Sequence, residues 1–111
     1  MKKTNPSRLT KSTARVKARG EVFTPPWLVT ETLNKVPQTM FRDSTKNVLD
    51  PACGNGNFLV QVVERKLRNG IDPVTCLRTT YGVDIMSDNV VECRQRLFQV
   101  VVKVASISPT D

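Results

Sequence analysis

The sequence predicts an α/β fold in which parallel strands are joined by helices. Helical and strand patterns alternate along residues 20–105, in the order helix, strand, helix, short helix, strand, helix. A strand, a glycine turn and the start of a helix also occupy the consecutive residues 48–59. This alternation favours right-handed crossovers between parallel strands. At 111 residues the chain is a single domain at most, and it is short for a complete doubly wound sheet.

The first helix is predicted between two prolines. Thr24 suits its N-cap, Pro25 fits the first helical position and Pro37 stops it. Its large apolar side chains fall roughly on one helical face: Trp27, Leu28, Leu33 and Val36. The segment that follows, 37–46, is expected to form a polar loop.

The glycine turn separates the first strand from the second helix. Val48 and Leu49 suit a strand at 47–50 that is covered on both faces. Asn57 suits the N-cap of the helix that follows, which is expected to end near residue 69. The apolar stripe of that helix consists of Phe58, Leu59, Val62, Val63 and Leu67.

The remaining elements are a short helix, a strand and a long helix. Asp72 and Pro73 form a cap-plus-proline signal for a helix over 73–78. Aromatic and β-branched residues then predict a strand over 79–84, and the last helix begins near Ser87. Its apolar positions recur at spacings of three and four: Val90, Cys93, Leu97, Val101 and Val104.

The net charge of +7 is concentrated in the first 19 residues, which contain no acidic residue. The basic residues of this segment are Lys2, Lys3, Arg8, Lys11, Arg15, Lys17 and Arg19. We therefore expect a basic, flexible arm at 1–19 ahead of a neutral domain at 20–111. The arm suits either contacts with the phosphate backbone of DNA, which weaken as salt rises, or a solvated leader.

Composition disfavours several classes of site and location. The chain has no histidine, which excludes Ser-His and Cys-His nucleophile pairs and most zinc sites. Its three cysteines have no framework spacing, which indicates reduced thiols and a cytoplasmic protein. No apolar stretch approaches the roughly 20 residues of a membrane span. We expect neither a bound metal nor a membrane partner.

The glycine turn offers groups of both signs to a ligand. Gly54 and Gly56 allow positive φ and a close approach to the backbone. Unpaired N–H donors at the start of the next helix favour a negative ligand group. The carboxylate of Asp50, at the end of the strand, suits a positive group. This pattern indicates the binding of an amino-acid moiety rather than a diphosphate, or else an ordinary strand-to-helix turn.

The run Asp-Pro-Ala-Cys-Gly-Asn-Gly at 50–56 resembles the first cofactor motif of S-adenosylmethionine-dependent methyltransferases. Its form is typical of the amino-group DNA methyltransferases that act on adenine. The resemblance implies a partial Rossmann-like methyltransferase fold, the first half of a doubly wound parallel sheet, with S-adenosylmethionine as cofactor. It also implies that Asp50 lies near the cofactor ammonium. The methionine part would be held by backbone groups around Ala52, Cys53, Gly54, Asn55 and Gly56.

A second segment, 20–28, resembles the motif that precedes the cofactor loop in the adenine methyltransferases. Phe23, Thr24 and Pro25 match that motif, which in the family folds over the methionine end of the cofactor. The resemblance therefore adds these three residues to the cofactor site. The alternative is a capped helix that packs Trp27 into the core.

Asp84 stands at the end of the second predicted strand. An acidic residue there commonly hydrogen-bonds the ribose hydroxyls of a nucleotide cofactor, because a carboxylate accepts two such bonds side by side. Ile85 follows it and is placed to pack on the adenine ring. The alternative is that Asp84 caps the helix after it.

The implied reaction is the transfer of a methyl group to the exocyclic amine of adenine in duplex DNA, with the base flipped out of the helix. No catalytic residue is identified. The run Thr-Pro-Pro-Trp at 24–27 only superficially resembles the Asn/Asp-Pro-Pro-aromatic catalytic motif, because threonine is outside the expected residue set.

Three alternatives therefore stay open for the function. The chain is a site-specific DNA adenine methyltransferase, or the N-terminal fragment of a larger or split one whose catalytic domain a partner chain completes. It is a non-catalytic, truncated methyltransferase-like module that binds nucleic acid or a partner protein. Or it belongs to a methyltransferase that acts on protein or RNA.

Overall fold

The computed structural model describes residues 23–105, so the basic arm and both chain ends lie outside the described range. The elements follow in the order α3 Pro26–Lys35, α4 Thr39–Arg42, β1 Val48–Asp50, α5 Asn57–Arg68, α6 Pro73–Arg78, β2 Thr80–Gly82 and α7 Ser87–Ala105. The predicted alternation of helices and strands is confirmed. In this part of the chain, no helix is long and apolar enough to cross a bilayer.

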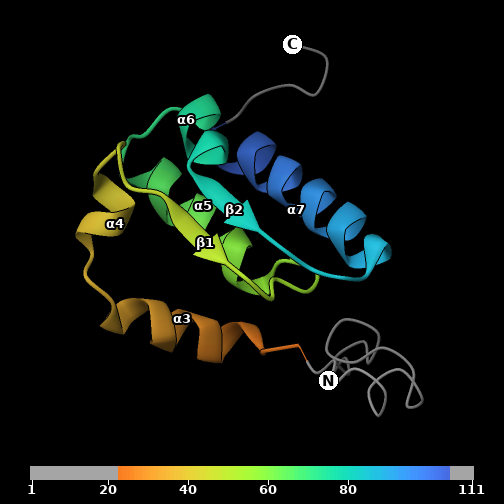
Figure 1. Ribbon diagram of the computed structural model, residues 1–111. Helices are drawn as coiled ribbons and strands as arrows, with labels where there is room; N and C mark the ends of the chain where they lie inside the picture. The colour runs from red at the N-terminus through yellow and green to blue at the C-terminus, as the bar shows by residue number, and fades with distance from the viewer. Residues whose placement is uncertain (1–22, 106–111) are drawn as a thin grey trace, which may run out of the picture.

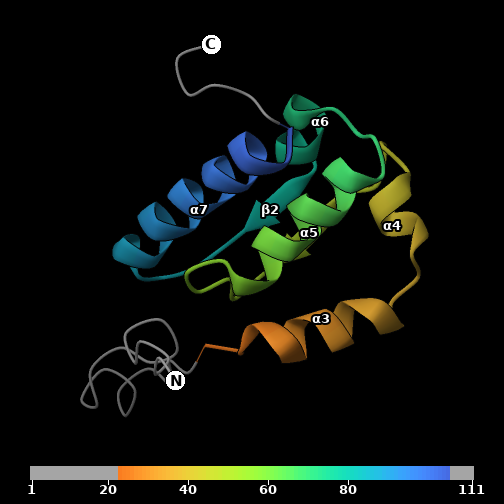
Figure 2. The same cartoon turned by 180° about the vertical axis from the view of Figure 1, so that it is seen from behind.

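The two strands pair in parallel, as predicted. Val48 lies opposite Thr80 in the register, and the pairing extends past the strands because Val83 N–H donates to Asp50 O over 3.0 Å. Both strands are shorter than the sequence pattern predicts. Figure 1 views the sheet from its uncovered face, and Figure 2 shows α5 and α7 on the opposite side.

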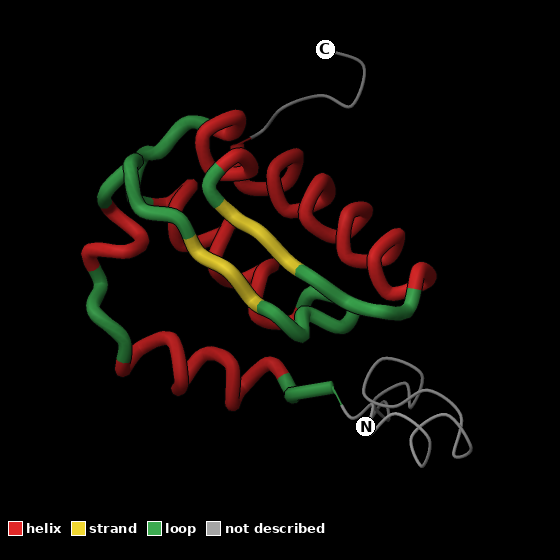
Figure 3. Tube along the Cα trace, in the orientation of Figure 1, coloured by secondary structure: helices red, strands yellow, loops and turns green. Residues whose placement is uncertain are grey.

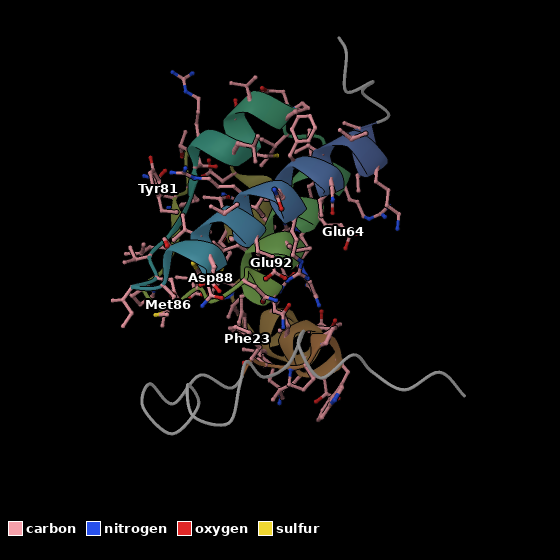
Figure 4. All side chains as sticks on the ribbon, turned by 90° about the vertical axis from the view of Figure 1, so that its right-hand side faces the viewer. Phe23, Glu64, Tyr81, Met86, Asp88 and Glu92 are labelled. Carbon is pink, nitrogen blue, oxygen red and sulfur yellow. The ribbon has the colours of Figure 1, made fainter. Side chains whose placement is uncertain are left out.

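The face of the sheet that lies opposite α5 and α7 carries exposed apolar side chains. Leu49 and its register partner Tyr81 are 60% and 51% exposed, and Val83 is also exposed. Figure 4 shows Tyr81 on the side of the sheet away from α5 and α7. The prediction that β1 is covered on both faces is therefore wrong for residues 23–105, because no described helix lies over this face.

The core is built around α5. One buried cluster joins α5 to α3 and α4 and consists of Val29, Leu33, Phe41 and Val62. A second cluster joins α5 to α6 and α7 and consists of Val63, Ile71, Cys76 and Val101. Leu59 is buried on the same helix, while Phe58 and Leu67 are half-buried, so the predicted stripe packs as expected.

The first described helix differs from its prediction in both cap and buried face. Pro25 is the N-cap of α3 and makes no side-chain cap bond, so Thr24 does not cap the helix. Trp27 is 64% exposed and Leu28 is also exposed, whereas Val29 and Leu33 are buried. Positions 29 and 33 are one turn apart and face α5, which leaves the two preceding residues outside the contact. The alternative that Trp27 packs into the core is wrong.

The predicted polar loop at 37–46 contains the short helix α4. This turn of helix buries Phe41, and the guanidinium carbon of Arg65 lies 5.4 Å from the centre of its ring. The loop therefore contributes to the core, because its aromatic side chain finds an apolar site against α5.

The predictions for α6 and α7 are confirmed. The Asp72 carboxylate accepts a hydrogen bond from Thr75 N–H over 3.0 Å, and this cap follows the predicted pattern. The bonds from Thr75 lower the pKa of Asp72 below its usual range. On α7, Cys93 and Val101 are buried as expected, and Leu97 packs against the same clusters.

Lys66 on α5 is completely buried, which its sequence pattern does not predict. Its ammonium donates to Thr79 O over 3.0 Å, to the Thr79 hydroxyl over 2.8 Å and to the Thr80 hydroxyl over 3.2 Å. It also reaches Lys46 O at 3.4 Å. Burial lowers the pKa of Lys66. These bonds join the segments that enter β1 and β2 at the amino end of the sheet.

Candidate functional site

The carboxyl ends of the two strands lie side by side, and the loops that follow them meet at that edge (Figure 3). Cys53 N–H donates to Val83 O over 2.9 Å, and Gly54 N–H donates to the Asp84 carboxylate over 3.0 Å. The sequence predicts a site built from these two loops, and the structure joins them directly.

The glycines of the turn adopt the predicted positive φ angles, 55° at Gly54 and 97° at Gly56. A Cβ atom at Gly54 would lie 2.7 Å from a ring carbon of Phe23, and one at Gly56 would lie 2.7 Å from the Cys93 sulfur. The space beside both glycines is thus filled by protein side chains. Because Gly54 and Gly56 have no side chain, Phe23 and Cys93 can pack on the turn. The backbone at these two positions is therefore covered by protein and is not open to a ligand.

A pocket of about 110 Å³ lies between the turn and the segment that precedes α3. Its lining consists of Phe23, Thr24, Asp50, Ala52, Cys53, Gly54, Asn55, Asn57 and Phe58. Most of the predicted cofactor residues are therefore brought together around one pocket. The predicted residues outside this lining are Pro25, Gly56, Asp84 and Ile85.

Four backbone donors of the turn are used within the protein, namely the N–H groups of Ala52, Cys53, Gly54 and Gly56. Ala52 N–H donates to the Asp50 carboxylate over 3.1 Å, and Gly56 N–H donates to Cys53 O over 2.9 Å. Within residues 23–105, the N–H groups of Asn57 and Phe58 in the first turn of α5 have no acceptor, as is usual at a helix start. Both residues line the pocket, so the donors available to a ligand lie there.

The pocket also contains a carboxylate oxygen with unused capacity. Asp50 Oδ1 accepts the bond from Ala52 N–H, whereas Oδ2 has no partner among the described residues. One side of the pocket therefore offers a negative group, and the start of α5 offers donors and the positive end of a helix dipole. This arrangement suits a ligand that carries an ammonium and a carboxylate together.

The Asp84 carboxylate lies outside the pocket lining and connects three parts of the chain. Besides the bond from Gly54 N–H, it accepts from Met86 N–H over 2.8 Å and from the Asn89 side chain over 3.3 Å. It thus supports the turn before α7 without accepting a bond from a backbone N–H of that helix, and it also holds the glycine turn. Ile85 beside it is exposed. The proposed contacts of Asp84 with ribose and of Ile85 with adenine stay predictions.

Cys53 is the one pocket residue with a thiol, and its environment disfavours a nucleophilic role. Burial raises the pKa of Cys53 to about 12, and the neighbouring Cys93, Asp84 and Asp50 contribute to this rise. The thiol therefore stays protonated at neutral pH and packs beside Cys93 and Leu59. Within the part of the chain described here, no group of three or more potential ligands gathers to hold a metal ion.

Several contacts at the site involve residues that the sequence pattern does not identify. The buried Asn55 side chain donates to Glu92 over 3.1 Å, and its Oδ1 has no hydrogen-bond partner in the described part of the chain. The prediction that Asn57 caps α5 is wrong, because Gly56 is the N-cap and the Asn57 side chain donates to Thr24 O over 2.7 Å. Its side-chain oxygen accepts from Arg96 over 2.7 Å. These partners lie more than 30 residues apart along the chain, so no local motif could reveal them.

Comparison with known proteins gives one informative match. No curated protein and no solved structure matches the chain. The family model for N-6 DNA methylases matches residues 9–100, which is most of the chain and includes both predicted cofactor motifs. The family implies a Rossmann-like methyltransferase fold and the use of S-adenosylmethionine. The chain therefore belongs to the N-6 DNA methylase family, as the resemblance of its cofactor motif predicts.

Proposed function

We propose that this chain binds S-adenosylmethionine in the pocket beside the glycine turn. The supporting observation is that Asp50 Oδ2 and the N–H groups of Asn57 and Phe58 lie around one pocket and have no partner among residues 23–105. The ammonium of the cofactor is assigned to the Asp50 carboxylate. Its carboxylate is assigned to the first turn of α5, where donors and helix dipole both favour a negative charge.

The size of the pocket supports binding of one part of the cofactor there. Pockets that enclose a whole drug-sized ligand measure about 300–1,000 Å³. The volume of about 110 Å³ suits the amino-acid end alone. The nucleoside is then assigned to the adjoining edge of the sheet, with the ribose at Asp84 and the adenine at Ile85.

In this proposal the reaction is methyl transfer to the exocyclic amine of adenine in DNA. The cofactor supplies the methyl group from its sulfonium, and the role of this chain is to bind and orient it. The residues that hold the flipped adenine are not assigned to segment 24–27, because threonine is outside the residue set of the catalytic motif and Thr24 lines the proposed cofactor pocket. The basic arm at 1–19 is assigned to the DNA backbone, with a steep loss of affinity as salt rises.

Replacing Asp50 with asparagine should weaken S-adenosylmethionine binding by about 10- to 100-fold in calorimetric titration. The reason is that the substitution removes a charge-assisted hydrogen bond of about 1.5–3 kcal/mol. The control is Glu31→Gln, which makes the same change of charge on the exposed side of α3. Equal affinity of Asp50→Asn and wild type, or no binding of the cofactor to wild type, would contradict the proposal.

A second candidate function is the binding of another polypeptide at the open sheet face, defined as Leu49, Tyr81 and Val83. Parallel sheets occur almost only with both faces covered, so this apolar face is unusual in a free protein. We propose that an apolar helix of a partner chain covers this face, so that the sheet has helices on both sides. In that case the chain serves as the cofactor-side part of an assembly.

The open sheet face should bind the dye ANS in the isolated protein, and the double variant Leu49→Lys, Tyr81→Lys should lose most of that signal. Lysine at these positions places charge where apolar side chains are now exposed. Trp27→Lys is the control, because Trp27 is also exposed but lies on α3, away from the sheet. Equal dye binding by all three proteins would show that this face is not accessible.

A further inference from the structure

Arg96 on α7 contacts the glycine turn and the start of α5, at Asn55 and Asn57. Its Nη1 donates to Asn55 O over 3.1 Å and to the Asn57 side-chain oxygen over 2.7 Å. These acceptors lie 41 and 39 residues earlier in the chain. A guanidinium suits this position because it is always charged and presents several donors in a fixed plane.

The bond from Arg96 fixes the orientation of the Asn57 amide. A side-chain amide has one oxygen and one NH₂ group, so the end that accepts from Arg96 must be the oxygen. The NH₂ group then points to Thr24 O and donates to it over 2.7 Å. If the amide were reversed, both bonds would be lost, since its NH₂ would face the guanidinium and its oxygen would face a carbonyl.

The contacts of Arg96 and Asn57 lead to residues 23 and 24, which form one wall of the pocket. Phe23 is buried against Gly54, and both Phe23 and Thr24 line the pocket. The following helix α3 has its own attachment, because the Gln61 side chain donates to Pro26 O over 2.9 Å. Loss of the Asn57 contact should therefore loosen the segment from Thr24 to the first turn of α3, while the rest of α3 stays attached.

A second side chain of α7 supports the same turn. Glu92, one helical turn before Arg96, accepts the bond from the Asn55 amide. Figure 4 shows Glu92 on the side of α7 that faces α5, and Phe23 between these helices and α3. One face of α7 thus holds both asparagines that flank Gly56.

We propose that Arg96 is a positioning residue for the cofactor pocket. Through the Asn57 amide, it holds the wall formed by Phe23 and Thr24 over the methionine end of the ligand. The assignment of that ligand rests on the proposed function above, whereas the link from Arg96 to the wall rests on the contacts alone. Arg96 is not among the residues that line the pocket, so it acts on the wall through Asn57.

The test combines amide hydrogen exchange with cofactor titration. Leu28 and Val29 N–H both donate to Pro25 O, so their exchange rates report on the position of the segment before α3. In Arg96→Gln, exchange at these two amides should rise about tenfold, and the dissociation constant for S-adenosylmethionine should rise about tenfold. Arg94→Gln, at an exposed position on the same helix, should change neither quantity.

Asn57→Asp separates positioning from general stability. An aspartate keeps an acceptor for Arg96 but loses the donor to Thr24 O, so it should release the wall with an unchanged melting temperature. Wild-type exchange at Leu28 and Val29 in both Arg96→Gln and Asn57→Asp would overturn the proposal, whether or not the cofactor binds. Raised exchange together with no cofactor binding by wild type would support the contact chain and overturn only the proposed function.

Discussion

Replacing Gly56 with alanine should lower the free energy of unfolding by about 3 kcal/mol. Two costs add at this position. The backbone has φ of 97°, a conformation that is unfavourable for a residue with a side chain. The new Cβ would also lie 2.7 Å from the Cys93 sulfur, so α7 would have to move away from the turn. Urea unfolding measures the loss, as a lower midpoint with an unchanged slope.

Gly70→Ala is the matched control for this substitution. Gly70 has nearly the same φ, 89°, but a Cβ added there would meet no atom within 4 Å. It should therefore lose only the conformational part, about 1–2 kcal/mol. Adding Cys93→Ala should reduce the cost of Gly56→Ala toward that of Gly70→Ala, because the clashing sulfur is gone. Equal costs at both glycines would contradict a close packing of α7 on the turn.

Lys66→Ala should cost about 3 kcal/mol, since truncation of a long buried side chain leaves a cavity and removes its hydrogen bonds. Lys66→Met keeps most of the volume and should cost less. The two variants thus separate the packing of the stem from the bonds of the ammonium to Thr79 and Thr80. Urea unfolding of both proteins gives the comparison.

The charge of Lys66 adds a dependence on pH with a definite sign. Burial lowers the pKa of Lys66 in the folded protein below its ordinary value of 10.5. Between these two pKa values the unfolded chain binds more protons, so the stabilising contribution grows as pH rises toward 10.5. Wild type should therefore gain stability relative to Lys66→Met over this alkaline interval. The exposed Lys35→Met is the control, and parallel pH profiles for wild type and Lys66→Met would rule out the effect.

The elements that the sequence predicts well have their signals within a few residues of each other. The cap at Asp72, the glycine turn before α5 and the apolar spacing of α7 are local patterns, and all three appear in the structure. The errors occur where distant segments decide the outcome. Phe41 is buried in a predicted loop because it packs against Val62 of α5. Trp27 is exposed because α3 faces α5 with Val29 and Leu33 instead.

The candidate site shows the same division between local and distant information. The lining from Asp50 to Asn55 follows directly from one contiguous motif. The internal use of the turn's donors depends on Asp84 and Val83, which arrive from the second strand. The role of Arg96 depends on a helix that the motif does not include. A single sequence carries no record of such pairings, because they form only when the chain folds.

Binding of the proposed partner at the open sheet face would make the stability of this chain depend on the concentration of that partner. A polypeptide that binds the folded form at Leu49, Tyr81 and Val83, and not the unfolded chain, stabilises it by mass action. At a partner concentration 100 times its dissociation constant, the gain is about 2.7 kcal/mol. The melting temperature of this protein would then be a property of the assembly, and copies without a partner would be the first to unfold and be degraded.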